Sequence, residues 1–331
     1  MPHRRHHPGD RIRPRGSRGA AAGRRPGSRG AHRGQPVRSR RQGRRNRGDL
    51  VRSSRQPGRL VIVAQGESRL GELFSVCRVG NRAALIGYLP TGYPDVPTSL
   101  TAMTALVDAG CDLVEVGVPY SDPGMDGPTI AKASEIALRG GVRIRDTLSA
   151  VEAISAAGGR AVVMTYWNPV LRYGVDAFAR DLAAAGGQGL ITPDLIPDEA
   201  DQWLAASDHY RLDRIFLVAP SSTPQRLAST LEASRGFAYA ASIMGVTGAR
   251  DVVSQAAPEL VRRIRAISDI PVGVGLGVRS GQQAAQIAGY ADGVIVGSAL
   301  VSTLAQGIPA LRGLTEELAA GVRQRISGVS A

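Results

Sequence analysis

The sequence predicts a single (β/α)8 barrel, the TIM-barrel fold, with an extra N-terminal helix and a long basic segment ahead of it. From residue 84 onward, eight short apolar runs alternate with amphipathic helical patterns. The runs are apolar throughout, which is typical of parallel strands that are covered on both faces. Eight strand-plus-helix units make a barrel of about 250 residues, and a chain of 331 residues accommodates that length.

The predicted strands are residues 84–89, 112–118, 161–166, 189–193, 214–219, 237–242, 271–275 and 293–297. Helical patterns between them include 97–110, 176–187 and 280–292. The extra helix, 68–79, places Leu70, Leu73, Phe74 and Cys77 on one face. A doubly wound open sheet is the competing architecture. The count of eight disfavours it, as does the lack of a GxGxxG turn after the first strand.

Residues 1–60 form a separate basic segment, and residues 66–331 form the predicted catalytic domain. The segment holds 19 arginines against Asp10 and Asp49, and it has too few apolar side chains to offset the entropy of ordering it. We therefore expect it to be disordered. Three origins compete: a nucleic-acid-binding arm, a transit peptide, and upstream sequence included by a wrong start codon. The Arg/Gly/Pro/Ser/Ala mixture favours the last, with Val61 or Val63 as the alternative start.

The rest of the composition indicates a cytoplasmic protein. Cys77 and Cys111 are isolated cysteines without metal-ligand spacing or a secretory segment ahead of them, so a reducing compartment is the simpler expectation. No run of 18 apolar residues predicts a membrane span.

An acidic stretch follows the second predicted strand, VEVGVPYSDPGMDGPT (114–129). In a barrel, chemistry lies at the C-terminal ends of the strands, so Glu115 and Asp126 are candidate acid–base groups. Burial raises the pKa of a carboxyl group toward the range where it can both give and take a proton. Structural roles are also open: Glu115 as part of a polar plug, Asp122 as a turn residue, and Asp126 as the N-cap of the next helix.

Glycine-rich segments follow the last strands: GVGLGV (273–278) and GVIVGSAL (293–300). Loops after strands seven and eight of this fold commonly bind phosphate, because glycine lets the backbone approach the anion. The segment MGVTGAR (244–250) adds Thr247 and Gly248, and its composition suggests a mobile lid. Tight turns alone would explain either glycine segment singly.

Six segments together resemble the alpha chain of tryptophan synthase in order and spacing: LIGYLPTGYPD (85–95), LVEVGVPYSDPGMDGPTI (113–130), TYWNPVLRYGVDAF (165–178), GLITPDLIPDEA (189–200), YAASIMGVTGAR (239–250) and VIVGSAL (294–300). The similarity covers about residues 68–325 and is most specific in the second segment. Nothing in the family accounts for residues 1–60.

The resemblance implies retro-aldol cleavage of indole-3-glycerol phosphate into indole and glyceraldehyde 3-phosphate, in tryptophan biosynthesis. It makes Glu115 the catalytic glutamate, Asp126 the aspartate that binds the indole N–H, and Tyr239 a tyrosine close to that glutamate. The remaining implied residues are the phosphate cradle of Gly248, Gly275, Gly297 and Ser298, and the indole-pocket tyrosines Tyr88 and Tyr166.

The resemblance further implies no metal or organic cofactor on this chain. It implies a partner, a PLP-dependent beta chain, in an alpha2-beta2 heterotetramer. Four residues at three places depart from the common family pattern: Gly124 and Met125 in the loop after the second strand, Ile243 before the predicted lid, and Val274, which stands for a frequent phenylalanine of the phosphate wall. Competing functions are a free-standing indole-3-glycerol phosphate lyase, another phosphate-binding barrel, and a non-catalytic binding protein with an Arg-rich arm.

Overall fold

The computed structural model describes residues 68–241, 256–275 and 277–324. The predictions about the basic segment 1–60, about Gly248 and Ile243, and about a lid at 244–250 therefore lie outside the described residues. Every described residue belongs to one of the two units into which the chain divides, Gly48–Ala331.

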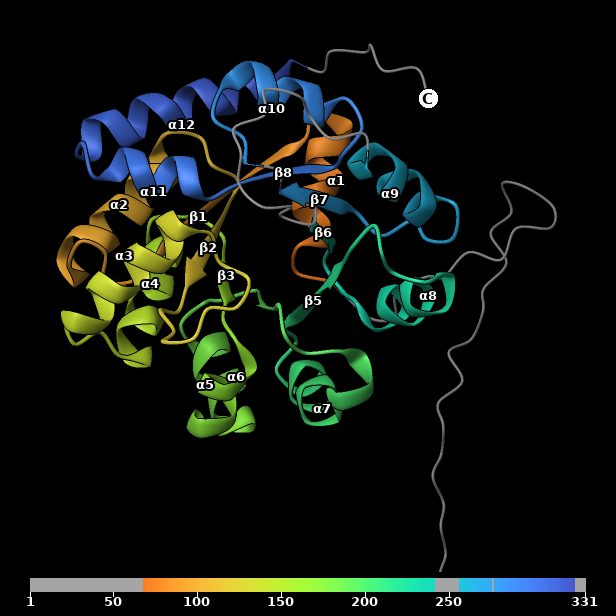
Figure 1. Ribbon diagram of the computed structural model, residues 1–331, viewed down its shortest axis with the longest axis horizontal. Helices are drawn as coiled ribbons and strands as arrows, with labels where there is room; N and C mark the ends of the chain where they lie inside the picture. Colours follow the sequence, from red (N-terminus) through yellow and green to blue (C-terminus); the bar gives the residue numbers. More distant parts are fainter. Residues whose placement is uncertain (1–67, 242–255, 276, 325–331) are drawn as a thin grey trace, which may run out of the picture. The chain divides into compact units, whose positions relative to one another are not determined.

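Eight parallel strands form a closed barrel in which each strand pairs with the next and β8 pairs with β1 (Figure 1). This confirms the predicted fold class, and each strand lies at or close to its expected position. The bounds are β1 Ala84–Pro90, β2 Leu113–Gly117, β3 Ala161–Met164, β4 Gly189–Thr192, β5 Asp213–Val218, β6 Ala238–Ala241, β7 Val272–Gly275 and β8 Gly293–Val296.

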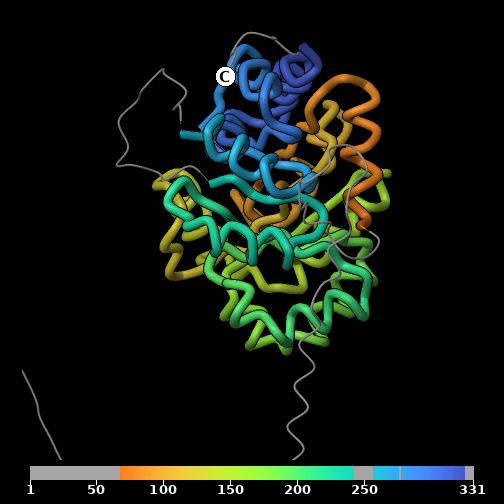
Figure 2. The backbone as a smooth tube through the Cα atoms, turned by 90° about the vertical axis from the view of Figure 1, so that its right-hand side faces the viewer, coloured from red at the N-terminus to blue at the C-terminus, as the bar shows by residue number. Residues whose placement is uncertain are grey.

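Helices surround the barrel, and the closing pair of strands brings the two ends of the described chain together. Figure 2 shows the blue C-terminal helices beside the orange elements that follow residue 68. The helices are α1 Gly71–Val79, α2 Val96–Asp108, α3 Pro128–Arg139, α4 Ile144–Ala156, α5 Trp167–Tyr173, α6 Val175–Ala184, α7 Asp201–His209, α8 Pro224–Ala233, α9 Ala256–Arg265, α10 Gly281–Ala288, α11 Ser298–Leu304 and α12 Ile308–Arg323, with a 3-10 turn η1 at Pro197–Glu199.

The extra helix α1 closes the N-terminal end of the barrel. Its apolar face is the predicted one, and all of its members are buried. They pack against a layer of residues that lie in the strands or, for Phe237, directly before one: Ala84, Ile86, Leu113, Val162, Ile191, Ile215, Phe237 and Ile295. With this end filled, a substrate cavity has room only at the opposite end, where the strands finish.

A buried carboxylate fastens α1 to the barrel floor. Asp213, the first residue of β5, accepts hydrogen bonds from the Ser68 hydroxyl at 2.9 Å and from the Leu70 amide at 2.8 Å. Its other oxygen lies 3.4 Å from the Arg235 guanidinium. Hydrogen bonds and an opposite charge of this kind offset the free-energy cost of burying a carboxylate.

The position of Val274 differs from the expectation that this residue belongs to the phosphate wall of the pocket. Successive strand residues point to opposite faces, and the neighbours of Val274 face inward: a Cβ on Gly273 would meet the Phe237 ring at 3.0 Å, and Gly275 lines the cavity. Val274 is accordingly buried in the core between barrel and helices. It does not line the pocket, so its size does not loosen the phosphate wall.

Candidate active site

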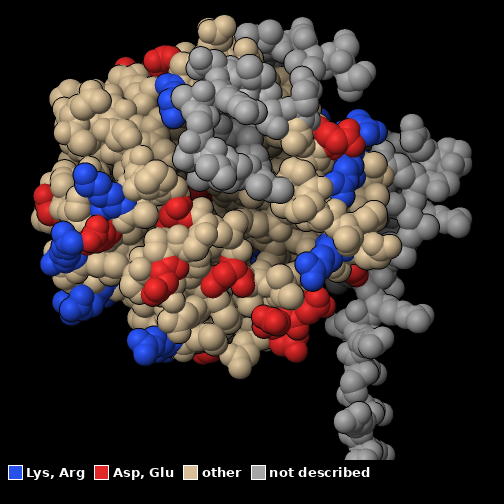
Figure 3. Space-filling model, viewed as in Figure 1, with Lys and Arg blue, Asp and Glu red and all other residues tan. Residues whose placement is uncertain are grey.

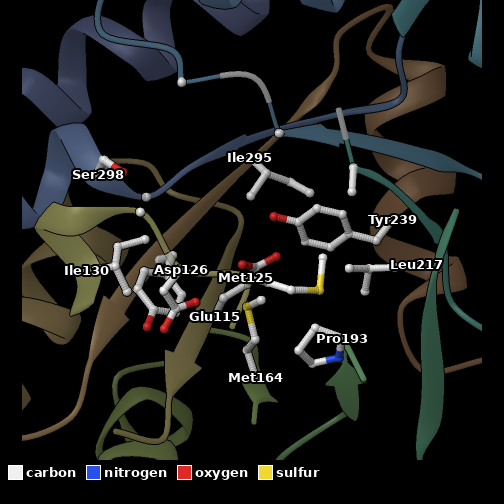
Figure 4. Close-up of a pocket in the computed structure, with 16 residues that line it drawn as sticks. Glu115, Met125, Asp126, Ile130, Met164, Pro193, Leu217, Tyr239, Ile295 and Ser298 are labelled. Atoms are coloured by element: carbon white, nitrogen blue, oxygen red, sulfur yellow. The ribbon is translucent and has the colours of Figure 1, made fainter. Parts of the chain in front are cut away.

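One cavity at the C-terminal end of the barrel brings most of the predicted site residues together (Figure 4). Glu115, Asp126, Tyr239, Tyr88, Gly275, Gly297 and Ser298 all line it. Tyr166 does not line it, and lies behind the loop that carries Asp126. Gly248 is outside the described residues.

Glu115 is the most unusual group in the cavity. It is the third residue of β2, it points into the barrel, and it is only 1% exposed. Neither of its carboxyl oxygens has a hydrogen-bond partner among the described residues. Because burial disfavours the charged form, the pKa of Glu115 is raised to about 8. A polar-plug role would require partners for these oxygens, so the unpaired carboxyl is better explained as a reactive group.

Asp126 enters the cavity from the loop between β2 and α3. The N-cap position of α3 is Gly127, and no side chain caps that helix, so the helix-cap interpretation of Asp126 is wrong. Burial raises the pKa of Asp126, and hydrogen bonding to Tyr166 opposes this shift. Asp126 therefore lies as a partly buried carboxyl group in the same cavity as Glu115, as the sequence predicted.

Tyr166 holds the Asp126 loop from behind. Its hydroxyl accepts a hydrogen bond from the Met125 amide at 2.9 Å. Its ring stacks on Tyr120, with ring centroids 5.1 Å apart. The hydrogen bond from Met125 attaches the loop, at the residue before Asp126, to the start of α5. The preceding turn is less tightly packed, because a Cβ built on Gly124 would have no neighbour within 4 Å.

Tyr239 stands on β6 and projects its hydroxyl into the cavity (Figure 4). A Cβ on Gly275 would lie 3.0 Å from this hydroxyl oxygen, so the absent side chain of Gly275 makes room for the Tyr239 ring. Burial raises the pKa of Tyr239 well above its ordinary value, with the nearby Glu115 charge as the next cause. The hydroxyl is therefore a neutral hydrogen-bond donor at working pH.

The ends of β7 and β8 supply backbone to the cavity. Gly275 ends β7 and Gly277 lies in the loop after it, with a φ of +67°, a conformation that favours glycine. Gly297 and Ser298 begin α11. The described lining includes no lysine, arginine or histidine. An anion at this end would therefore depend on backbone amides and on the Ser298 hydroxyl.

Sequence reasoning missed the apolar part of the wall. Strand parity was the available signal: Leu217 lies in register with Tyr239, and Ile295 lies two residues before Gly297 on the same face. The same parity applies to Ala241, two residues after Tyr239 on β6, and to Met164 at the end of β3, whereas the remaining members come from loops and helix ends. The additional lining residues are Met125, Gly127, Ile130, Met164, Pro193, Leu217, Ala241, Gly277 and Ile295.

Two negative findings apply to the described residues. No group of three or more His, Cys, Asp or Glu side chains is placed there to hold a metal ion. No helix among the described residues has the length and apolar character needed to cross a membrane.

A barrel mouth that combines two carboxyl groups of raised pKa, a neutral tyrosine and an amide-lined end defines a class of protein: an acid–base enzyme of the TIM-barrel fold. Comparison with known proteins gives the family. The family model for the tryptophan synthase alpha chain matches residues 74–326, and the chain belongs to this family.

The relatives agree. The tryptophan synthase alpha chain of Mycobacterium tuberculosis H37Rv is 80% identical over 269 residues, which is 81% of this chain and 100% of the relative. That of Mycobacterium avium is 83% identical over 267 residues, which is 80% of this chain and 98% of the relative. A solved structure of M. tuberculosis tryptophan synthase has a TM-score of 0.76 and 81% identity, and covers 78% of this chain and 99% of that one.

The activity follows from the family. The chain is a lyase of tryptophan biosynthesis, and it catalyses the cleavage of indole-3-glycerol phosphate to indole and glyceraldehyde 3-phosphate. A free-standing lyase, a different phosphate-binding barrel and an Arg-armed binding protein are not favoured.

Proposed function

We propose that Glu115 is the proton shuttle of this cleavage and that Asp126 stabilises the indole nitrogen while the carbon–carbon bond breaks. One observation carries the proposal: a buried carboxyl group faces the substrate cavity with both oxygens unpaired among the described residues and a pKa of about 8. Near neutral pH such a group holds its proton but gives it up readily, as a group must that both donates and accepts in one cycle.

The proposed step begins with protonated Glu115. The acid gives its proton to C3 of the indole ring, which places positive charge on the ring nitrogen. The Glu115 carboxylate then takes the proton of the adjacent glycerol hydroxyl. As the C–C bond breaks, its electron pair returns to the ring and the hydroxyl carbon becomes the aldehyde. Indole and glyceraldehyde 3-phosphate leave, and Glu115 is again protonated.

Asp126 and Tyr239 have supporting roles in this proposal. The Asp126 carboxylate accepts the indole N–H and offsets the charge that develops there. The Tyr239 hydroxyl, a neutral donor beside Glu115, stabilises that carboxylate after it has lost its proton. General acid–base groups of this kind each contribute roughly 10²- to 10⁴-fold to the rate.

The phosphate group of the substrate lies, in this proposal, against Gly275, Gly297 and Ser298, with Gly248 completing the cradle. The indole ring occupies the apolar side of the cavity near Tyr88, and Tyr166 acts by holding the Asp126 loop. In this proposal the chain needs no cofactor of its own, because side chains carry out the proton transfers and the protonated indole ring accepts the electron pair of the C–C bond that breaks. We also propose that the enzyme is cytoplasmic.

We further propose that a PLP-dependent beta chain docks over the barrel mouth, in an alpha2-beta2 assembly. Loops and helices after β2, β3 and β4 expose three large apolar side chains: Met125 at 51%, Leu171 at 50% and Ile196 at 46%. Acidic side chains gather near α5 and α7 on the face shown in Figure 3: Asp198 and Glu199 lie in η1, and Asp201 begins α7. We name Met125, Leu171 and Ile196 the mouth patch.

An indole-release assay on purified variants tests the catalytic roles. Glu115→Gln keeps the shape of the side chain but cannot cycle a proton, so indole release should fall by about 100-fold or more. Asp126→Asn should cause a comparable loss with the fold intact, because it keeps an acceptor but not the charge. Circular dichroism and binding of a non-cleavable substrate analogue serve as controls. Turnover within a few-fold of wild type in Glu115→Gln would remove Glu115 from the mechanism.

A further inference from the structure

Tyr88 spans the cavity wall between the two ends of the proposed site. It lies on β1, its Cα is paired with that of Glu115 on β2, and it is 7% exposed. A Cβ built on Gly297 would lie 3.5 Å from Cδ1 of the Tyr88 ring. One edge of the ring therefore lies against the proposed phosphate loop, and the hydroxyl end points the other way, toward β2.

Gly117 on β2 has no side chain and so leaves room for the hydroxyl end of Tyr88. A Cβ on Gly117 would lie 2.7 Å from Cε2 and Cζ of the Tyr88 ring, and its closest neighbour would be the Tyr88 hydroxyl oxygen. Real Cβ atoms do not approach so closely. Gly117 is thus a notch in the barrel wall that receives the phenol end of Tyr88. A phenylalanine ring would fill an apolar wall equally well, so packing alone does not explain the hydroxyl.

The titratable groups that act on the hydroxyl are acidic or phenolic, and none of them is a cation. Burial is the main cause that raises the Tyr88 pKa, followed by the charges of Asp126 and Glu115, and then by Tyr166. Tyr239 faces the same space from β6. No cation among the described residues lines the cavity to balance Asp126. A buried carboxylate without a cation depends on hydrogen-bond donors to stay ionised, and Tyr166 is one such donor.

We propose that Tyr88 is a positioning residue for Asp126: in the substrate-bound enzyme the hydroxyl held over Gly117 donates a hydrogen bond to the Asp126 carboxylate and keeps it ionised. Asp126 then lies between two tyrosine donors, Tyr166 behind the loop and Tyr88 inside the cavity. The inference rests on the proposed role of Asp126 and extends it to the group that maintains its charge.

Tyr88→Phe tests the inference, because it removes only the hydroxyl. Loss of a donor to the ionised form raises the pKa of Asp126. The acid limb of the kcat profile should therefore move to higher pH by about one unit, and kcat on that limb should fall about tenfold, the effect of one hydrogen bond to a charged group. The loss should shrink at higher pH, where Asp126 is ionised in both enzymes, and KM should change little.

A packing defect would give a different result, a loss of the same size at every pH. The matched control is Tyr290→Phe, which removes a buried tyrosine hydroxyl that is unpaired among the described residues and lies outside the cavity lining; it should leave the profile unchanged. Asp126→Asn is measured in parallel. If Asp126→Asn is inactive and Tyr88→Phe has a wild-type profile, or a loss of equal size at all pH values, the Tyr88 inference is overturned alone. If Asp126→Asn is fully active, the proposed function fails as well.

Discussion

At the scale of the residue, the burial that makes Glu115 reactive also makes the folded protein less stable as pH rises. Its ordinary pKa of 4.5 applies to the unfolded chain, and burial raises the pKa to about 8 in the folded protein. Between these two values the folded protein binds more protons than the unfolded chain does. The contribution of the protonated group to stability is therefore complete below about pH 4.5 and is lost as pH rises toward 8.

This linkage predicts how Glu115→Gln changes stability. Glutamine does not titrate, so the variant escapes this loss of stability. The gap between the free energies of unfolding of Glu115→Gln and wild type should therefore shift in favour of the variant by more than about 1 kcal/mol between about pH 5 and pH 8. Urea unfolding at the two pH values measures the gap. Glu259→Gln, at an exposed ion pair with Arg262, is the control and should show little change in the gap. If the free energies of unfolding of wild type and Glu115→Gln change equally with pH, Glu115 is not held in a low-dielectric site.

At the scale of the element, α1 is held by its apolar face and by one buried carboxylate, Asp213. Asp213→Ala removes the acceptor for Ser68 and Leu70 and leaves Arg235 without one of its charged partners. Breaking a buried ion pair from one side is strongly destabilising, so we expect a loss of about 3 kcal/mol in the free energy of unfolding. Activity in the absence of denaturant should remain, because α1 lies at the opposite end of the barrel from the cavity.

A surface pair on α2 and α12 offers the comparison. Asp108→Ala breaks the ion pair between Asp108, which is 55% exposed, and Arg312, which is 41% exposed. This change should lower the free energy of unfolding by less than about 1 kcal/mol. Urea unfolding measures both variants. Equal losses in Asp213→Ala and Asp108→Ala would show that α1 is held by its apolar face alone.

The elements also show where sequence reasoning succeeds and where it stops. Short apolar runs that alternate with helical patterns placed all eight strands, and the one-sided pattern of Leu70, Leu73 and Phe74 placed α1. Assigning Val274 to the pocket failed, although parity with Gly275 would have corrected it. The cap interpretation of Asp126 needed the structure, because helix α3 starts one residue later than a cap at 126 would require. The Gly117 notch depends on a contact between two strands, which no local pattern encodes.

At the scale of the whole molecule, the proposed docking of a beta chain on the mouth patch predicts that activity depends on the partner. Indole is small and apolar, so an enzyme that releases it gains when a second subunit covers the exit. We expect a cognate beta chain to raise indole formation by an order of magnitude or more, a coupling of roughly 1 to 3 kcal/mol. Leu171→Asp should leave the activity of the isolated chain unchanged and remove most of the activation.

Leu138→Asp is the matched control for the partner experiment. Leu138 is 37% exposed and lies near the end of α3, away from the mouth patch. Size-exclusion chromatography and the indole assay, each with and without the beta chain, separate association from activation. If Leu171→Asp and Leu138→Asp respond alike to the beta chain, the docking surface lies elsewhere on the molecule.

The pairing of β1 with β8 has a consequence for synthesis on the ribosome. β1 ends at Pro90, but its partner on one side, Gly293–Val296, is among the last segments to be translated. At about 5 to 20 residues per second, the first strand waits roughly 10 to 40 s for that edge to be covered. An unpaired edge is a template for aggregation. The nascent barrel therefore spends most of its translation as an open sheet, the stage at which a chaperone has the most to protect.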